Sequence, residues 1–360
     1  MAVMMNSVFS VDINGNSSLG DCTNISVINT FDSIDIKWTD PQDVIFNDSI
    51  ITQWKGTKLI RKEDAYPTNE KDGVTVVDST IRNKYSAVAF KDTDVISDKV
   101  YYYCLFPYTD NGVSLSDKNR FTGKRVTFDP ILKNNTWSKI EQASEMGIAS
   151  QIWQIGDEID LKLSGAFNET ITLQIWGFNH FDKSDGSGKA GICFGMKGVF
   201  DRTYKMVDTY DRDSTPDWTI SRIRKNDMVN LLNSVPPELK NIIKTVILQS
   251  CAIRNSDGSI VTVSSQDKIF IPGATELGIS RGYDGNQKKL PIFTDNKSRV
   301  KKISNGTDVS YWTRSAVDGK WSNSYSIADK DGSWSTCLIG QFDSGTSYTH
   351  SCHMCVMFNI

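Results

Sequence analysis

The stretch VYYYCLFPY, residues 100–108, has the clearest strand pattern in this chain of 360 residues. Successive side chains of a β-strand point to opposite faces, and here large apolar or aromatic residues occupy both faces. The stretch therefore predicts a β-strand, and the segments around it indicate what kind of domain contains it. The two predicted faces are Tyr101, Tyr103 and Leu105 on one side and Tyr102, Cys104 and Phe106 on the other.

Further strand-like runs lie on the N-terminal and C-terminal sides of this stretch. In SIDIKWTDP, residues 33–41, three apolar residues alternate with polar ones, which is the pattern of a half-buried strand. Turn-forming pairs such as Asp72-Gly73 separate the runs. About seven short strands in roughly a hundred residues is the spacing of a β-sandwich. The other predicted runs surround Trp54, continue through 58–61 and end with 121–128.

Residues 23–128 resemble a fibronectin type III module. The features that carry the resemblance are the inward-facing Trp38 just before an Asp-Pro pair and the Tyr-rich strand at 100–108, which a hairpin turn follows. The resemblance implies an all-β sandwich that serves as a spacer or adaptor. We expect no catalysis in it, because the stretch contains no His. Residues 1–22 are expected to be an N-terminal attachment segment.

Residues 129–135 are expected to be a linker, and residues 136–360 a second domain that mixes helices and strands. Ser138 and Glu141 have the spacing of a capping box, which predicts a helix. Residues 217–232 have helical spacing and predict a second one. The remaining expected elements are a hairpin from 155–163 and 169–178, a polar turn at 180–191, a short helix running into a strand at 238–248, and then strands joined by long loops.

Six segments of the second domain, taken in their order along the chain, carry a resemblance to a known family. They are IGDE (155–158), ITLQIWGFNHFDKSDGSGKAGICFGMK (171–197), PPELK (236–240), IKTV (243–246), QDKIF (266–270) and YWTRS (311–315). With these segments the domain resembles a family of functionally undescribed bacterial and phage domains. That family usually has Trp-Trp-Leu-Arg-Ser-Pro at the last site, where this chain has Tyr311 first and Ala316 last, and the C-terminal segment SCHMCVMFNI also departs from the family.

The resemblance implies an α+β fold with C-type-lectin-like character for residues 136–360. It also implies that Trp312 is a buried anchor and that Arg314 is paired inside the domain.

The composition describes an ordered globular chain of balanced charge. Hydrophobic residues make up 39% and charged residues 23% of the chain, as in folded domains. Forty Lys and Arg against 43 Asp and Glu give a net charge of −3, which argues against a partner held through its phosphates. No apolar run approaches the roughly 20 residues of a membrane span. We therefore expect neither nucleic-acid binding nor membrane insertion.

The N-terminal residues and the cysteines bear on the compartment. Residues 1–22 contain no Lys or Arg and lack the apolar core of a secretory signal, so we expect synthesis in a bacterial cytoplasm. The seven cysteines form an odd set without a repeating framework. In a reducing compartment this indicates buried thiols.

Two segments of the polar turn are similar to ligand-binding loops but depart from the required spacing. GSGKAG at 186–191 lacks the first Gly of a phosphate loop and the Ser or Thr that follows its Lys. The loop from Asp182 is similar to a calcium loop, but its twelfth position is Cys193 and not Glu. We expect a solvated turn without a cofactor. The minor alternative is a cation site that does not follow the calcium-loop pattern.

Four residues near the C-terminus carry side chains that suit zinc: His350, Cys352, His353 and Cys355. In a strand, alternate residues face opposite sides, so the four ligands could not converge. We therefore expect no metal site and interpret these cysteines as buried, with a zinc site as the minor alternative.

The sequence contains no arrangement typical of catalysis. It has no Gly-x-Ser-x-Gly motif, and only three His residues are available as general bases. We expect no enzymatic activity. Two carboxylates suffice for a glycoside hydrolase, so a glycan or peptidoglycan hydrolase stays open as an alternative.

Aromatic residues among Ser, Asn, Asp and Gly near the C-terminus are the candidates for ligand binding. A flat ring covers the CH face of a sugar while amides and carboxylates bind its hydroxyls. The alternative is that half or more of these rings lie in the core. The residues predicted to bind a ligand are Tyr283, Asp284, Trp321, Tyr325, Trp334 and Tyr348.

Together these features favour a receptor-binding protein of a phage tail or a phage-tail-like bacteriocin. Such proteins are made in the cytoplasm, become part of the tail tip and leave by lysis. We predict that residues 1–22 and the first domain attach to other tail or baseplate proteins, and that the second domain binds a bacterial surface glycan or a surface-layer protein. A homotrimer is expected, because multivalency strengthens weak binding. The alternatives are a tail-associated hydrolase and a purely structural baseplate protein.

Overall fold

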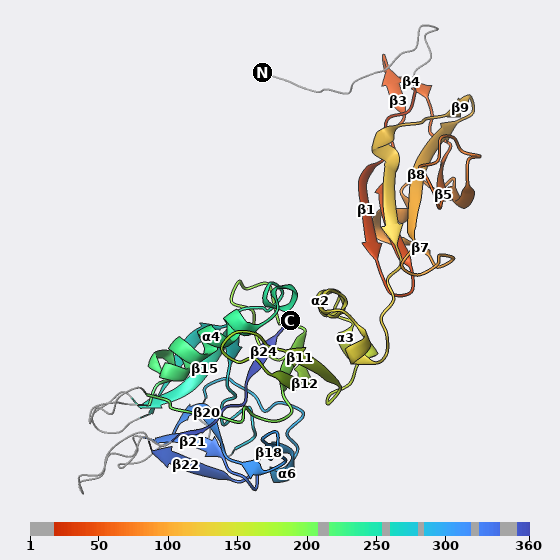
Figure 1. The fold of residues 1–360 in the computed structure, drawn as a ribbon. Helices are drawn as coiled ribbons and strands as arrows, with labels where there is room; N and C mark the ends of the chain where they lie inside the picture. Colours follow the sequence, from red (N-terminus) through yellow and green to blue (C-terminus); the bar gives the residue numbers. More distant parts are fainter. Residues whose placement is uncertain (1–17, 208–215, 254–259, 280–283, 318–323, 339–350) are drawn as a thin grey trace, which may run out of the picture. The chain divides into compact units, whose positions relative to one another are not determined.

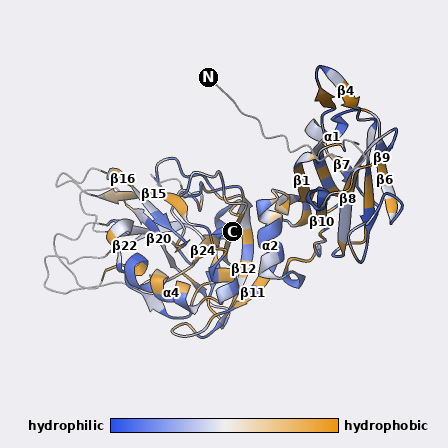
Figure 2. Cartoon of the chain, turned by 90° about the horizontal axis from the view of Figure 1, so that it is seen from above, coloured by the Kyte–Doolittle hydropathy of each residue, from blue (hydrophilic) through white to orange (hydrophobic). Residues whose placement is uncertain are grey.

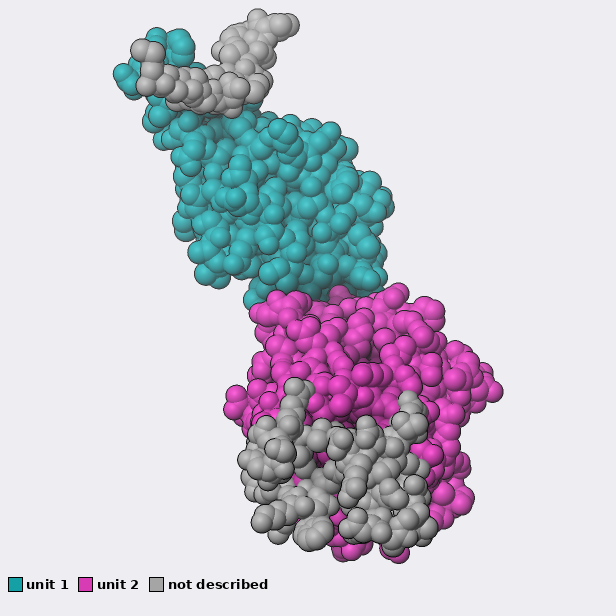
Figure 3. Space-filling view, turned by 90° about the vertical axis from the view of Figure 1, so that its left-hand side faces the viewer, with its two compact units in different colours: residues 1–128 teal, residues 129–360 magenta. Residues whose placement is uncertain are grey.

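The computed structural model describes residues 18–207, 216–253, 260–279, 284–317, 324–338 and 351–360. The chain divides into two compact units, residues 1–128 and residues 129–360, which Figure 3 draws in teal and magenta. Both are built mainly from β-strands (Figure 1), which confirms the expectation of a β-rich fold.

Unit 1 contains two larger antiparallel sheets. One has the strand order β1-β2-β7, and the other has the order β10-β8-β5-β6 with β9 paired to β8. A separate hairpin, β3–β4, follows β2 in the chain. The elements are β1 (Thr23–Asn29), β2 (Ile34–Thr39), β3 (Val44–Phe46), β4 (Ser49–Thr52), β5 (Gly56–Lys62), β6 (Val74–Ser79), α1 (Lys84–Ala87), β7 (Phe90–Asp92), β8 (Val100–Thr109), β9 (Gly112–Val113), η1 (Asp117–Asn119) and β10 (Arg120–Lys124).

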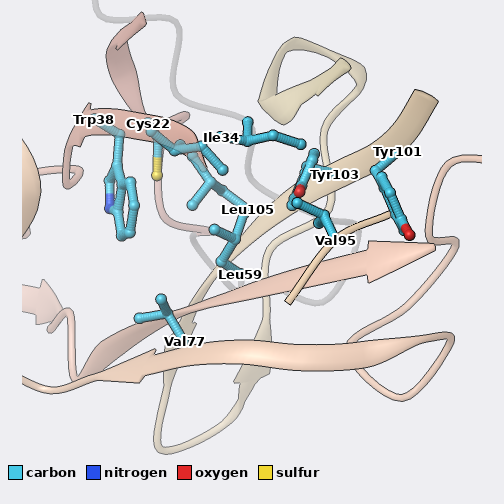
Figure 4. Close-up of a cluster of buried hydrophobic side chains, with 10 residues drawn as sticks. Cys22, Ile34, Trp38, Leu59, Val77, Val95, Tyr101, Tyr103 and Leu105 are labelled. Atoms are coloured by element: carbon cyan, nitrogen blue, oxygen red, sulfur yellow. The ribbon is translucent and has the colours of Figure 1, made fainter. Parts of the chain in front are cut away.

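The core of unit 1 is made by side chains from both sheets (Figure 4). Ile34 and Trp38 come from β2, and they pack with Leu59 of β5 and Leu105 of β8. The indole nitrogen of Trp38 donates to Asp40 Oδ1 at 2.9 Å, so the polar atom of this buried ring has a partner.

Strand β8 confirms the alternation predicted from VYYYCLFPY. Tyr101, Tyr103 and Leu105 belong to the core between the sheets. Cys104 and Phe106 belong to a second, smaller buried cluster on the other face. Both faces of β8 are therefore covered, which explains why its sequence is apolar throughout.

The β3–β4 hairpin exposes apolar side chains on the surface of unit 1. Its hydrophobic residues are coloured orange in Figure 2, where β4 is labelled. Asn47 and Asp48 have φ angles of 47° and 61°, as the tight turn of a two-residue hairpin requires. The exposed apolar residues of this hairpin are Ile45 (55%), Phe46 (61%), Ile50 (56%) and Ile51 (51%).

Unit 2 contains two five-stranded sheets, with the orders β11-β12-β13-β24-β17 and β14-β23-β20-β21-β22, and the pairs β15–β16 and β18–β19. The elements are η2 (Leu132–Asn134), α2 (Trp137–Glu145), α3 (Ala149–Ile152), β11 (Glu158–Lys162), β12 (Thr170–Phe178), β13 (Ile192–Met196), β14 (Thr203–Tyr204), η3 (Trp218–Ile220), η4 (Ile223–Asp227), α4 (Met228–Ser234), α5 (Pro237–Lys240), β15 (Val246–Ile253), β16 (Ile260–Asp267), β17 (Ile269–Phe270), α6 (Asn296–Arg299), β18 (Lys301–Lys302), β19 (Asp308–Val309), β20 (Tyr311–Ala316), β21 (Ser324–Ala328), β22 (Trp334–Leu338), β23 (Cys352–His353) and β24 (Met357–Asn359).

Residues 129–135, predicted to be a linker, are part of unit 2. Leu132 is 2% exposed, and the Asn135 amide donates to the carbonyl oxygens of Asp129, Ile131 and Leu132. The Trp153 indole donates to Asp129 O at 3.0 Å. These contacts give the segment a folded conformation.

The helices of unit 2 differ from the predicted ones at their ends. Helix α2 begins two residues earlier than the predicted capping box, because the Thr136 hydroxyl, and not that of Ser138, accepts from one of the free backbone N–H groups of the first turn, that of Lys139. The predicted helix at 217–232 is broken into η3, η4 and α4. Ser221 is extended and its hydroxyl donates to Trp218 O, a local bond that competes with the helix.

No helix in the described residues is long and apolar enough to cross a membrane.

Lys301 is buried among aromatic rings in unit 2, at 3% exposure. Its ammonium donates to Met196 O at 2.9 Å and lies 4.7 Å from the ring centroid of Trp176 and 5.7 Å from that of Phe293. Burial lowers the pKa of Lys301, so these contacts do not fully replace the water that the charge has lost.

Replacing Lys301 with Met is expected to raise the free energy of unfolding at pH 7 by about 1–2 kcal/mol, because a similar shape remains without a buried charge. The unfolded chain holds the Lys301 proton more tightly than the folded chain does, so the wild type gains stability as pH rises toward about 10, near the ordinary lysine pKa. The difference in unfolding free energy between variant and wild type, measured by urea unfolding, should therefore be smaller at pH 10 than at pH 7. The exposed neighbour Lys302, replaced with Met, is the control. A less stable Lys301→Met protein would contradict the expectation.

Candidate functional site

Tyr325, predicted to bind a ligand, is buried. It is 1% exposed on β21, its ring packs against Trp312 with the centroids 6.2 Å apart, and its hydroxyl accepts from Asp217 N at 2.7 Å. The prediction is wrong for this residue, because β21 is covered on both faces and its aromatic ring belongs to the core.

Asp284, also predicted to bind a ligand, is 1% exposed and fully used inside the unit. Oδ1 accepts from Cys251 N at 2.9 Å, and Oδ2 accepts from Thr275 N at 3.0 Å and from the Ser315 hydroxyl at 2.7 Å. This prediction is wrong as well, because the carboxylate holds three backbone segments together.

Trp334 is half-buried at the start of β22. The other three residues predicted to bind a ligand, Tyr283, Trp321 and Tyr348, lie outside the described residues.

Trp312 and Arg314 are fully buried, which confirms what the family resemblance implied for them. The Trp312 indole donates to Tyr204 O at 2.7 Å. Arg314 forms an ion pair with Glu276, which is also fully buried. These residues stabilise the interior and do not reach solvent.

The four residues considered as zinc ligands do not form a described metal site. His350 lies outside the described residues. His353 Nδ1 lies 2.9 Å from Phe200 O, and the Cys355 thiol contacts Met196 O at 3.7 Å, whereas Cys352 lies beside Cys337. Among the described residues, no group of three or more His, Cys, Asp or Glu side chains could hold a metal ion.

A polar pocket of about 300 Å³ lies beside the connection between β12 and β13 in unit 2. Its walls come from three places in the chain: this connection, strand β15 and the segment that follows Asp284. We call it the first pocket. Its lining residues are His180, Phe181, Asp182, Lys189, Ile247, Gln249, Asn286, Gln287 and Lys288.

The β12–β13 connection is a compact turn, as its sequence predicted. Gly186 and Gly188 have φ angles of 75° and 104°, where a residue with a side chain would be strained. Lys183 N donates to Gly188 O, and Asp185 Oδ1 accepts from Ser187 N at 2.9 Å. The turn therefore presents the residues on its two arms in a defined position.

Opposite charges meet at the rim of the first pocket. Lys189 Nζ lies 2.8 Å from Asp182 Oδ1, and both side chains are exposed. His180 Nε2 lies 3.0 Å from Lys288 O, and burial lowers the pKa of His180. His180 is therefore mainly neutral at pH 7, and its ring adds a polar atom to the pocket without a full charge.

Amide and apolar groups form the rest of the first pocket. Gln249 Oε1 accepts from Asn286 N at 2.6 Å, which fixes the segment after Asp284 against β15. Phe181 is 2% exposed, and its ring packs on Phe270 with the centroids 5.4 Å apart. The pocket thus combines a firm apolar base with donors and acceptors in its walls.

A second pocket, of about 260 Å³, is lined in part by the same turn and shares Lys189 with the first. Lys244 in its wall forms ion pairs with Glu145 at 2.7 Å and with Glu141 at 3.3 Å. The hydrogen bond from Lys244 lowers the pKa of Glu145, so this carboxylate is ionised at neutral pH. The lining residues are Ser144, Glu145, Gly147, Asn179, Lys183, Ser187, Lys189, Ala190, Gly191, Lys244 and Ile360.

The two pockets contain the kinds of groups that suit a ligand with many hydroxyl groups. Amides, paired charges and a neutral imidazole offer both donors and acceptors, and the apolar base can cover CH groups. The turn at 180–191 is recognisable in the sequence, whereas Gln249 and Asn286 were not predicted as part of a site. No sequence signal connects these two amides with the turn, since the fold alone brings them together.

A family model for a domain of unknown function (DUF6273) matches residues 204–360. The matched range contains β15, the segment after Asp284 and the YWTRS motif, whereas the β12–β13 turn precedes it. None of the curated proteins matches the chain.

Proposed function

We propose that this protein is a non-enzymatic receptor-binding protein of a phage tail or a phage-tail-like bacteriocin. In this proposal unit 1 is an adaptor that attaches to other tail or baseplate proteins. Unit 2 binds a bacterial surface receptor, and the assembled protein is a homotrimer at the tail tip. A surface glycan is the favoured receptor and a surface-layer protein the second choice.

The strand order of unit 1 supports a fibronectin type III-like adaptor. A three-stranded sheet, β1-β2-β7, and a four-stranded path, β10-β8-β5-β6, share one core. A three-stranded and a four-stranded sheet around one core support a seven-stranded sandwich. The exposed apolar hairpin β3–β4 supports attachment to another protein, since such patches are typical of interaction sites.

The connections of unit 2 support a lectin-like domain. Its last strand, β24, returns to pair between β13 and β17, and the helices α2 and α3 precede the first strand. Phe358 of β24 lies opposite both Phe194 and Ile269. A lectin-like fold by itself carries no binding activity, so the function depends on the site.

The observation that carries the proposal is the first pocket, with its polar walls over Phe181 and Ile247. A sugar ring has hydroxyl groups on its edge and CH groups on its faces, and the pocket offers partners for both. Its volume of about 300 Å³ is at the lower end for ligand sites, which fits one or two sugar units of a longer chain.

Replacing both Asn286 and Lys288 with Ala is expected to weaken binding to isolated bacterial cell walls about tenfold or more. Each exposed side chain can contribute one hydrogen bond to a glycan, and such bonds contribute about 0.5–1.5 kcal/mol, or more for a charged donor. Binding is measured by co-sedimentation with walls from a panel of strains. The Lys162→Ala variant, which changes an exposed lysine of β11 outside both pockets, should bind as the wild type does.

Other results of this experiment separate the alternatives. Release of reducing sugars from the walls by the wild type would favour a hydrolase. Wild-type binding by the double variant would show that the first pocket is not the receptor site. In particles, loss of assembly on removal of residues 136–360 would favour a purely structural baseplate protein, because a receptor-binding domain is needed only for adsorption.

A further inference from the structure

Two cysteines from different strands of unit 2 have their sulfur atoms in contact. Cys337 lies on β22 and Cys352 on β23, and the two Sγ atoms are 3.4 Å apart. Cys337 is 7% exposed and Cys352 is half-buried. Both are free thiols in this structure, as are the other five cysteines.

We propose that Cys337 and Cys352 form a disulfide bond when the protein meets an oxidising pool of small-molecule disulfides. The sulfurs need to approach by only about 1.4 Å to reach the roughly 2.05 Å of a disulfide. Cys355 is close in sequence, but its thiol contacts Met196 O and lies on the fully buried side. The pairing is therefore specific to Cys337 and Cys352, and it does not depend on the proposed function.

The surroundings of the two thiols assign them different steps in this exchange. The hydrogen bond between the two thiols lowers the pKa of Cys352, whereas the same contact and burial raise the pKa of Cys337. Cys352 is also the more exposed of the two. Cys352 is thus the attacking thiolate and Cys337 the resolving thiol.

The reaction balances with oxidised glutathione as the oxidant. The Cys352 thiolate attacks one glutathione sulfur, so that a mixed disulfide forms and one glutathione leaves. The Cys337 thiol then loses its proton and attacks Cys352 Sγ, which releases the second glutathione. In total two protein thiols are oxidised to one disulfide, and one glutathione disulfide is reduced to two thiols.

The disulfide would close a covalent ring of residues 337–352. A ring of this length removes conformations from the unfolded chain and so favours the folded state. We expect oxidation to raise the melting temperature of the protein by on the order of 5–10 °C.

The test uses the full chain, purified in reduced form and then equilibrated with excess oxidised glutathione. The expected result is the loss of two of the seven thiols, reversed by dithiothreitol. Residues 331–360 contain no Lys or Arg, so trypsin leaves all three C-terminal cysteines in one fragment, whose mass falls by two hydrogen atoms. Chymotrypsin cleaves after Phe342 and Tyr348, which lie between Cys337 and Cys352. After this digestion the two cysteines stay in one product only if a disulfide bond joins them.

Variants distinguish this pair from other pairings. Cys337→Ser and Cys352→Ser should each abolish the joined product and the rise in melting temperature, whereas Cys104→Ser in unit 1 should keep both. Seven unmodified thiols after equilibration, or a joined product that contains Cys355 in place of Cys352, would overturn the proposal. The wild-type protein alone gives these readouts, so they do not depend on how well a variant folds.

Discussion

Replacing Glu276 with Gln is expected to lower the free energy of unfolding of unit 2 by about 3–5 kcal/mol. Glu276 and Arg314 are both fully buried, and Glu276 Oε2 accepts from Arg314 Nη1 at 2.7 Å and from Gly273 N at 2.9 Å. A second contact joins Oε1 to Nη2. Without the carboxylate, the guanidinium charge would stay in the interior without its hydrogen-bonded counter-charge, and the carboxylates of Asp284 and Asp267 would compensate it only in part.

The other donors of Arg314 are also used, so the guanidinium cannot turn elsewhere. Nε donates to the Ser250 hydroxyl at 2.9 Å, Nη1 to Ile271 O at 3.0 Å and Nη2 to Gln249 O at 3.2 Å. Gln249 also lines the first pocket. The buried ion pair therefore positions Gln249, which lines the first pocket. We expect the Glu276→Gln variant to lose binding to bacterial cell walls as well as stability.

A double-mutant cycle tests this account. Arg314→Met alone leaves the Glu276 carboxylate buried and should cost a similar amount, and Glu276→Leu alone leaves the guanidinium buried and should do the same. The two changes combined remove both charges and should give a protein more stable than either of these single variants. The measurement is urea unfolding followed by tryptophan fluorescence. Asp308→Asn, which removes the exposed pair with Lys302, is the control and should cost less than about 1 kcal/mol. Single variants that cost as little as this control would show that the pair contributes little.

The strands of unit 1 could be predicted from its sequence because they follow a simple physical rule. In SIDIKWTDP every second residue is apolar, and Ile34, Ile36 and Trp38 are indeed buried at 0–1% exposure. One face of β2 meets the core and the other does not, so the period of two is visible in the sequence. The burial of Trp312 and Arg314 could be foreseen only from a resemblance.

The burial of Tyr325 and Asp284 could not be predicted, because both lie among polar residues, and polar residues usually indicate an exposed segment. All five residues of β21, SYSIA, are buried, although two of them are serines. Some polar groups in this region have partners inside the unit; for instance, the Thr313 hydroxyl donates to Ser326 O at 2.6 Å, whereas the buried Ser326 hydroxyl has no partner among the described residues. In a strand covered on both faces, a tyrosine between serines does not indicate exposure.

Only the turn of the candidate site could be recognised in the sequence, because the other lining residues are brought to it by the fold. The turn at 180–191 is polar and rich in Gly, which is a local property. Gln249 and Asn286 become part of the same pocket through the hydrogen bond from Asn286 N to Gln249 Oε1. That contact joins residues 37 positions apart, and no periodicity or spacing encodes it.

Replacing Asp92 with Asn in unit 1 is expected to cost about 3–4 kcal/mol of unfolding free energy. Asp92 of β7 is 3% exposed and faces Arg61 of β5, whose Nη1 lies 2.7 Å from Oδ1 and 2.9 Å from Oδ2. The Tyr103 hydroxyl donates to Oδ2 at 2.8 Å. Since β5 and β7 belong to different sheets, this cluster joins the two layers of the unit.

The three members of this cluster should not contribute equally. Tyr103→Phe removes one hydrogen bond while the ion pair stays, so it should cost only about 1 kcal/mol. Asp92→Asn removes the buried counter-charge of the Arg61 guanidinium, which then keeps the exposed Asp94 carboxylate, 3.1 Å from Nη2, as its ion-pair partner. The guanidinium also lies over the Tyr101 ring, 5.2 Å from its centroid, and Arg61 is only 7% exposed, so it cannot turn freely into water. Asp110→Asn, at the exposed pair with Lys55, is the control with little expected change. Hydrogen exchange followed by mass spectrometry should place the lost protection of Asp92→Asn in peptides from residues 18–128. Equal costs for Asp92→Asn and Tyr103→Phe would mean that the hydrogen bond, and not the buried charge pair, holds the two sheets together.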